Sequence, residues 1–212
     1  MAWVNPWGGR RYTNAIEMRE DGGTPGFLQA FRTALCVKLK EQMNGNGQYM
    51  VIREHELCQQ LMNGLRSIPE CSLLAGHHTE RHGIVSLTLR NIHYNLAVQL
   101  LNDRFGIQAR GGCSCAGPYG HYLLGLGWAQ SAQIAEAITV GDQSLRPGWI
   151  RLSLHPIMTN QEVERIVSAV RNIVTHIQQW KQDYVYDAST NSWTHIYEED
   201  PAEAKVKELF SV

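Results

Sequence analysis

Apolar side chains recur every three or four residues along much of the chain, and this spacing marks one face of an α-helix. Four long stretches with this pattern predict helices at residues 25–43, 51–68, 94–105 and 159–177, and a shorter one predicts a helix near 129–137. The helix at 159–177 has the clearest start, because Thr159 and Glu162 have the spacing of a capping box. Gly106 is expected to end the helix at 94–105.

Strands follow from a different pattern, the alternation of apolar and polar residues. The segments expected to form strands are residues 72–75, 83–89, 107–109 and 149–154, followed by a hairpin at 184–187 and 193–196 and a last helix at 201–210. This order of elements predicts an α+β fold, in which a small antiparallel or mixed sheet is backed by helices on one face.

The strand at 149–154 carries an arginine on its second face. Its apolar face consists of Ile150, Leu152 and Leu154, which leaves Trp149, Arg151 and Ser153 on the other face. A guanidinium group offers two parallel N–H donors to a carboxylate, so Arg151 is a candidate carboxylate anchor. An exposed arginine on a sheet edge explains the same pattern, and this strand alone leaves both interpretations open.

Composition narrows the classes of function. Only 18% of the 212 residues are charged and the formal net charge is −1, so no basic field favours nucleic acid or an anionic membrane surface. Five irregularly spaced cysteines are typical of a reducing compartment, and a cytoplasmic location is expected. No apolar run has the length of a signal peptide or a membrane span.

Reactive and flexible residues crowd together at residues 109–118. Cys113 and Cys115 lie close to Arg110, and a nearby cation favours the nucleophilic thiolate form of a thiol. Glycines on both sides of the cysteines allow unusual turns, which indicates a site or, equally well, a plain turn with two small buried cysteines. A metal held by the two cysteines and His121 would have too few ligands, so no metal is expected.

The start of the first long helix offers a second candidate site. Thr24 is expected to cap this helix and Pro25 to occupy its first position. Free backbone N–H groups beside Gly23 suit a bound phosphate or carboxylate. An ordinary capped helix explains the same residues.

Three motifs in this order resemble the class V aminotransferase family and, within it, the cysteine desulfurases. The motifs are the Gly-Gly-Thr-Pro turn before a long helix, the Arg-Gly-Gly-Cys-Ser-Cys-Ala-Gly-Pro stretch, and the Ile-Arg-Leu-Ser-Leu strand followed by the Thr-Asn-Gln-Glu-Val helix start. The resemblance implies a fold-type I enzyme that uses pyridoxal phosphate (PLP), acts on an amino acid and works as a homodimer. It covers residues 19–177 and implies the C-terminal small domain of such an enzyme.

The same resemblance implies roles for five residues. Cys115 matches the nucleophile that takes up sulfur as a persulfide, which a sulfur-acceptor protein can then receive. Arg110 matches an arginine near cofactor and substrate, and Arg151 matches the arginine that binds the substrate α-carboxylate. Gly23 and Thr24 match the turn that reaches the PLP phosphate of the other subunit.

One essential residue of the family has no match. Its PLP-binding lysine lies before the Gly-Thr-Pro turn, whereas all five lysines here, Lys38, Lys40, Lys181, Lys205 and Lys207, lie after it. We therefore expect a remnant of the large domain at 1–18, the C-terminal domain at 19–181, an extension at 182–212, and no activity of this piece alone. The alternatives are a non-catalytic dimerisation or substrate-binding module, or a family member that catalyses transamination or a lyase reaction.

Overall fold

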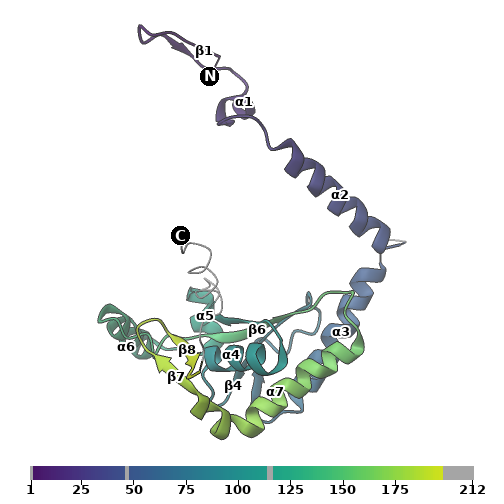
Figure 1. Cartoon of the computed structure of the whole chain (residues 1–212), viewed down its shortest axis with the longest axis vertical. Helices are drawn as coiled ribbons and strands as arrows, with labels where there is room; N and C mark the ends of the chain where they lie inside the picture. The colour runs from purple at the N-terminus through teal and green to yellow at the C-terminus, as the bar shows by residue number, and fades with distance from the viewer. Residues whose placement is uncertain (1, 46–47, 114–116, 198–212) are drawn as a thin grey trace, which may run out of the picture. The chain divides into compact units, whose positions relative to one another are not determined.

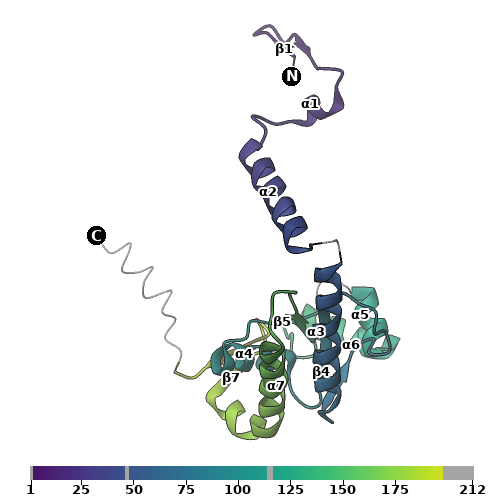
Figure 2. The same ribbon diagram turned by 90° about the vertical axis from the view of Figure 1, so that its right-hand side faces the viewer.

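The computed structural model describes residues 2–45, 48–113 and 117–197. It divides into two compact units, residues 1–50 and residues from 51 onward, and each is described by itself. Figures 1 and 2 show both units from two directions. The predicted boundaries after residues 18 and 181 stay predictions. Within the described ranges, no helix combines the length and the apolar character needed to span a membrane.

The first unit contains two helices and a small strand pair. Strands β1 (Trp3–Val4) and β2 (Arg10–Arg11) are antiparallel, and helices α1 (Ile16–Glu20) and α2 (Phe27–Met43) follow. The prediction that Thr24 caps α2 is wrong, because the capping position is Gly26 and no side chain caps it. The backbone N–H of Phe27 donates to the Pro25 carbonyl at 2.8 Å, so a tight turn delays the start of the helix.

The second unit is built around a four-stranded antiparallel sheet. Its strands are β3 (Cys71–Leu73), β4 (Ile84–Leu89), β5 (Arg110–Gly112) and β6 (Trp149–Ser153), in the spatial order β3-β4-β6-β5. The helices α3 (Tyr49–Arg66), α4 (Tyr94–Phe105) and α7 (Asn160–Trp180) supply most of the remaining core. The predicted α+β fold is confirmed.

One face of the sheet and three helices form the hydrophobic core. The inward residues of β4 and β6 are Val85, Leu87, Leu89, Ile150 and Leu152, and all are buried. They pack with buried leucines and valines of α3, α4 and α7. Helices α3 and α7 lie side by side (Figure 2), and Gly64 makes this approach possible because a Cβ there would lie 2.6 Å from Val167.

The predicted C-terminal end of α4 and the predicted start of α7 are confirmed. Gly106 follows α4 in the left-handed conformation, with φ of 64°. At the start of α7, the Thr159 hydroxyl accepts the Glu162 backbone N–H at 3.2 Å, and the Glu162 carboxylate accepts the Thr159 N–H at 2.7 Å. This reciprocal pair is the capping box that the sequence predicts.

The segment between β5 and β6 differs from its prediction. It contains α5 (Gly117–Leu124), which the sequence does not predict, and α6 (Trp128–Thr139), which contains the predicted helix. A Cβ at Gly120 of α5 would lie 3.3 Å from the Trp149 ring, so α5 packs on the second face of the sheet. That face is therefore partly covered.

Two further predictions have clear outcomes. The strand predicted at 107–109 is wrong, since β5 begins at Arg110. Gly111 explains the shift, because a Cβ there would collide with Asn95 Oδ1, and only glycine lets this strand approach α4. The predicted C-terminal hairpin is confirmed as β7 (Tyr184–Asp187) and β8 (Ser192–His195). The short helix η1 (Lys181–Asp183) precedes it. The helix predicted at 201–210 lies outside the described residues.

Candidate functional site

The two arginines that were predicted as site residues lie directly opposite each other on the second face of the sheet. In the strand register Arg151 of β6 pairs with Ser86 of β4 on one side and with Arg110 of β5 on the other. Directly opposed residues in an antiparallel pair have Cβ atoms about 4.5–5.5 Å apart. The sheet therefore brings Arg110 and Arg151 together. The sequence motifs alone did not predict this pairing.

A hollow of about 400 Å³ lies beside Arg151 on this face. It is lined by Leu74, Ala75, His78, Arg81, Ser86, Tyr119, Leu123, Trp149 and Arg151. The strands β4 and β6 form its floor, and α5 contributes Tyr119 and Leu123 to its wall. Its size is suited to a small molecule.

Arg151 is half-buried and incompletely paired. Its Nε atom is buried and has no hydrogen-bond partner among the described residues. The ion pairs formed by arginines in these ranges involve Arg19, Arg53 and Arg104, so neither Arg151 nor Arg110 has a carboxylate partner there. Like charges opposite each other in a sheet are unfavourable, and an anion between them would relieve both problems.

A third arginine, Arg81, has a different role in the wall of the hollow. Its Nε donates to the His78 carbonyl at 2.8 Å, and its Nη2 donates to the carbonyl of Ala75. Both bonds close the loop between β3 and β4. Neither Arg81 nor Ser86 is among the residues predicted for a site, although the outward position of Ser86 in an alternating strand is a signal that could identify it.

The structure places one of the two candidate cysteines. Cys113 comes directly after β5 and is half-buried with a free thiol. The Cβ of Cys113 lies 3.8 Å from the position that a Cβ would take at Gly120 of α5. Cys115 lies outside the described residues. The ring nitrogens of His121 lie 2.8 Å from the Gly117 carbonyl and 2.9 Å from the Ser131 hydroxyl, so both are already hydrogen-bonded.

The predicted phosphate-binding residues belong to the first unit. Gly23 and Thr24 lie between α1 and α2, and both are exposed. Apart from its neighbours in the chain, no residue in the described ranges comes within 4 Å of a Cβ built on Gly23. Their relation to Arg110 and Arg151 stays a prediction.

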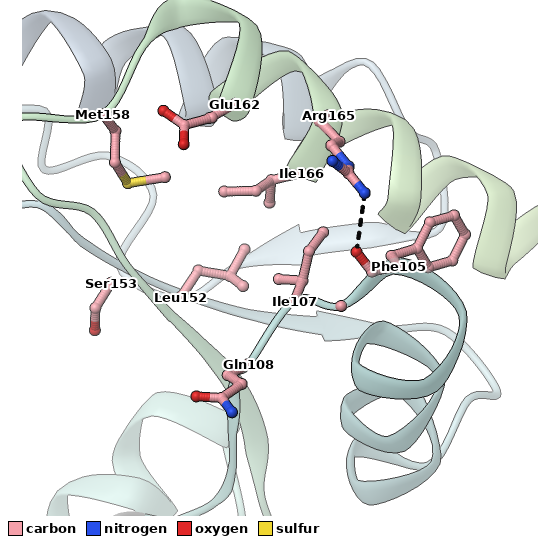
Figure 3. Close-up of a pocket in the computed structure, with 10 residues that line it drawn as sticks. Phe105, Ile107, Gln108, Leu152, Ser153, Met158, Glu162, Arg165 and Ile166 are labelled. Carbon is pink, nitrogen blue, oxygen red and sulfur yellow. Dashed lines mark hydrogen bonds between the residues drawn. The ribbon is translucent and has the colours of Figure 1, made fainter.

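A second hollow, of about 390 Å³, lies between α7, β6 and the segment after α4 (Figure 3). Two charged side chains line it, and both already have partners. Arg165 donates to the Phe105 carbonyl at 3.4 Å, and Glu162 is bound in the capping box. Because its charged groups are used locally, this hollow is the weaker candidate.

The fold and the arginine pair define an α+β domain with a candidate anion site on the second, partly covered face of its sheet. A model of the class V aminotransferase family matches residues 8–166, and the chain belongs to this family. No curated protein matches it.

A solved structure has a similar fold. It is the apo structure of a cysteine desulfurase from Thermococcus onnurineus NA1, with a TM-score of 0.61 and 24% sequence identity. The similarity covers 81% of this chain and 36% of that protein. At this identity the likeness shows the fold alone, and the chain spans little more than a third of the length of this relative.

The family is PLP-dependent in general, so we tested whether the hollow fits this cofactor. The orphaned Nε of Arg151 fits the carboxylate of an amino acid. No lysine is among the described residues that line the hollow, and Lys181 instead lies with its Nζ 5.5 Å from the centre of the Trp193 ring. The lining therefore fits the substrate end of the site and does not fit the covalent attachment of PLP.

Burial should divide the four described cysteines into reactive and unreactive ones. Burial raises the pKa of the Cys71 thiol to about 12 and also raises the pKa of Cys58, which is fully buried. At pH 8 iodoacetamide should therefore label Cys71 roughly tenfold to a hundredfold more slowly than the exposed Cys36, because the smaller thiolate fraction outweighs the higher nucleophilicity of each thiolate. Peptide mass spectrometry over a time course measures this, and equal rates for Cys36 and Cys71 in the folded chain would contradict it.

Proposed function

We propose that this chain forms the amino-acid-binding and sulfur-accepting part of a PLP-dependent, cysteine desulfurase-like enzyme. Arg151, assisted by Arg110, binds the α-carboxylate of the substrate, and Cys115 accepts its sulfur as a persulfide. Gly23 and Thr24 bind the cofactor phosphate of the partner subunit in a homodimer. The lysine that holds PLP comes from outside this chain.

The observation that carries this proposal is the state of Arg151. A half-buried guanidinium with an orphaned Nε, opposite a second arginine, costs free energy unless a negatively charged group binds it. A carboxylate accepts two parallel N–H donors from one guanidinium group, and the amino acid that the family binds carries such a group.

The wall of the hollow strengthens this binding. Leu74, Leu123 and the buried Trp149 line it, so they keep water away from part of the arginine. Electrostatic attraction is stronger where the surroundings polarise less than water. These apolar side chains therefore favour a bound carboxylate over a hydrated one.

The proposed division of labour separates binding from chemistry. PLP, when bound, supplies the electron sink for reactions at the amino acid. The residues of this chain hold the carboxylate and present the Cys115 thiolate to the substrate sulfur. The S–S bond of the persulfide would form as the C–S bond of the substrate breaks, and the electron pair of that bond would stay with the substrate carbon, which takes up a proton. Cys113 and Cys115 follow the strand that carries Arg110, which links the candidate nucleophile to the carboxylate site through a few residues of backbone.

The test is to locate the persulfide. The holoenzyme that contains this chain is incubated with L-cysteine, alkylated and digested, and the modified cysteine is identified by mass spectrometry. We expect a persulfide on Cys115, its loss in Cys115→Ser and its retention in the matched Cys113→Ser variant. Turnover without modification of Cys115, or a persulfide on Cys113 alone, would contradict the assignment.

The absence of a lysine from the lining, among the described residues, favours a second candidate function. On this view the chain by itself binds amino acids without catalysing a reaction. PLP added to the chain should then not develop the absorbance of a lysine-bound cofactor beyond that of PLP mixed with an unrelated protein of equal lysine content. A stoichiometric absorbance change that borohydride fixes to one lysine would exclude this alternative.

A further inference from the structure

The C-terminal hairpin holds a buried polar residue in a strained backbone conformation. Asn191, at the turn before β8, is only 6% exposed and is the one buried polar residue in the part of the chain that the structure describes. Its φ of 57° lies in the left-handed region, which Asn tolerates better than most residues. Such a residue persists where its surroundings determine its conformation strongly.

Three hydrogen bonds fix Asn191. Its Nδ2 donates to the Tyr94 hydroxyl at 2.6 Å, and its Oδ1 accepts the Tyr186 hydroxyl at 2.9 Å. Its backbone carbonyl accepts Asn95 Nδ2 at 2.5 Å. Two of these partners, Tyr94 and Asn95, form the first turn of α4, so the hairpin turn is bonded to the start of this helix.

The start of α4 in turn holds the backbone of β5 and the approach to β6. The Tyr94 hydroxyl donates to the Arg146 carbonyl at 3.2 Å. A Cβ at Gly148 would lie 2.6 Å from the Tyr94 ring, and a Cβ at Gly111 would lie 3.1 Å from it. Glycine at both positions therefore lets the Tyr94 ring lie directly against the strands that carry Arg110 and Arg151.

A second connection joins the same turn to the segment before β6. The Gln143 backbone N–H donates to the Ala188 carbonyl at 2.9 Å, and its side-chain Nε2 donates to the Ser189 carbonyl at 2.6 Å. The turn at 188–191 is thus bonded both to α4 and to the chain that enters β6. This hairpin lies outside residues 8–166, the part that matches the family.

We propose that Asn191 is a positioning residue, which acts through Tyr94 to hold β5 and the start of β6 and so controls the exposure of Cys113. The proposal goes beyond the proposed function, because it concerns a part of the chain without a family match and does not require PLP or substrate. Release of this contact frees the end of β5, directly before Cys113, without disturbing the core formed by α3 and α7.

The test compares alkylation rates of individual cysteines in the full chain. Asn191→Gly keeps the left-handed backbone and removes the side chain, and Tyr94→Phe removes only the hydroxyl. In each variant we expect Cys113 to react with iodoacetamide about tenfold faster, because a lost buried hydrogen bond favours local opening. Cys36 supplies the internal reference, and Cys58 and Cys71 report on the core.

Two matched controls separate positioning from general loosening. Thr194→Ala changes an exposed residue of the same hairpin, and Tyr197→Phe removes a hydroxyl from an exposed tyrosine outside the hollow. Neither should change the Cys113 rate. An unchanged Cys113 rate in both Asn191→Gly and Tyr94→Phe overturns the proposal, and so does a parallel rise at Cys58, Cys71 and Cys113, which would indicate only a less stable fold.

Discussion

Replacement of Gly148 by alanine is expected to lower the free energy of unfolding by about 1–3 kcal/mol, the usual cost of overpacking. The new Cβ would lie 2.6 Å from the Tyr94 ring and 2.8 Å from the Gly112 Cα. One of these neighbours is a backbone atom of the adjacent strand, so rotation of the tyrosine does not remove the conflict. Urea denaturation followed by circular dichroism measures the change.

A matched glycine provides the control for this prediction. A Cβ at Gly117 would meet no atom of the described residues within 4 Å, chain neighbours aside, and this residue begins α5. Gly117→Ala should therefore leave the free energy of unfolding within about 0.5 kcal/mol of the original, as surface substitutions usually do. Equal stabilities of Gly148→Ala and the unmodified chain would show that β5 and β6 can separate at no cost.

Local patterns predicted the elements that depend on local chemistry. The helix predicted at 94–105 coincides with α4, and the capping box at Thr159 starts α7. The alternation at 149–154 correctly placed Arg151 opposite the core face. In each case the side chains that fix the element are neighbours in sequence, so a periodic pattern records them.

The errors arose where distant residues decide the outcome. The sequence placed a strand at 107–109, but the contact between Gly111 and Asn95 of α4 moves β5 to Arg110–Gly112. Helix α5 was missed because its glycines and Pro118 are poor helix formers, and its packing on Trp149 compensates for them.

In the candidate site too, features fixed by neighbouring residues were predicted, and features fixed by distant residues were not. The sequence motifs identified Arg110 and Arg151 separately, but their pairing depends on the order of strands in the sheet. The contact of Asn191 with Tyr94 joins residues 97 positions apart, and no local pattern records it. Cys115, Gly23 and Thr24 remain predictions that rest on the family resemblance.

Replacement of Arg151 by methionine should weaken the binding of the amino acid by about a hundredfold, since loss of a buried charge partner costs about 2–5 kcal/mol. In the holoenzyme this appears as a rise in KM for the amino acid, and in the isolated chain as loss of chemical-shift changes on titration with L-alanine. Arg165→Met is the matched control, because Arg165 lines the second hollow and binds a backbone carbonyl there.

Arg151→Met should leave the free energy of unfolding unchanged or raise it. Because the same substitution weakens binding of the amino acid, the two effects together make the prediction specific. Arg151→Met removes a guanidinium with an orphaned buried Nε and ends the opposition of two like charges across β5 and β6. A residue kept for binding is often unfavourable for stability. A lower melting temperature with unchanged amino acid binding would instead show that Arg151 supports the sheet and that the carboxylate binds elsewhere.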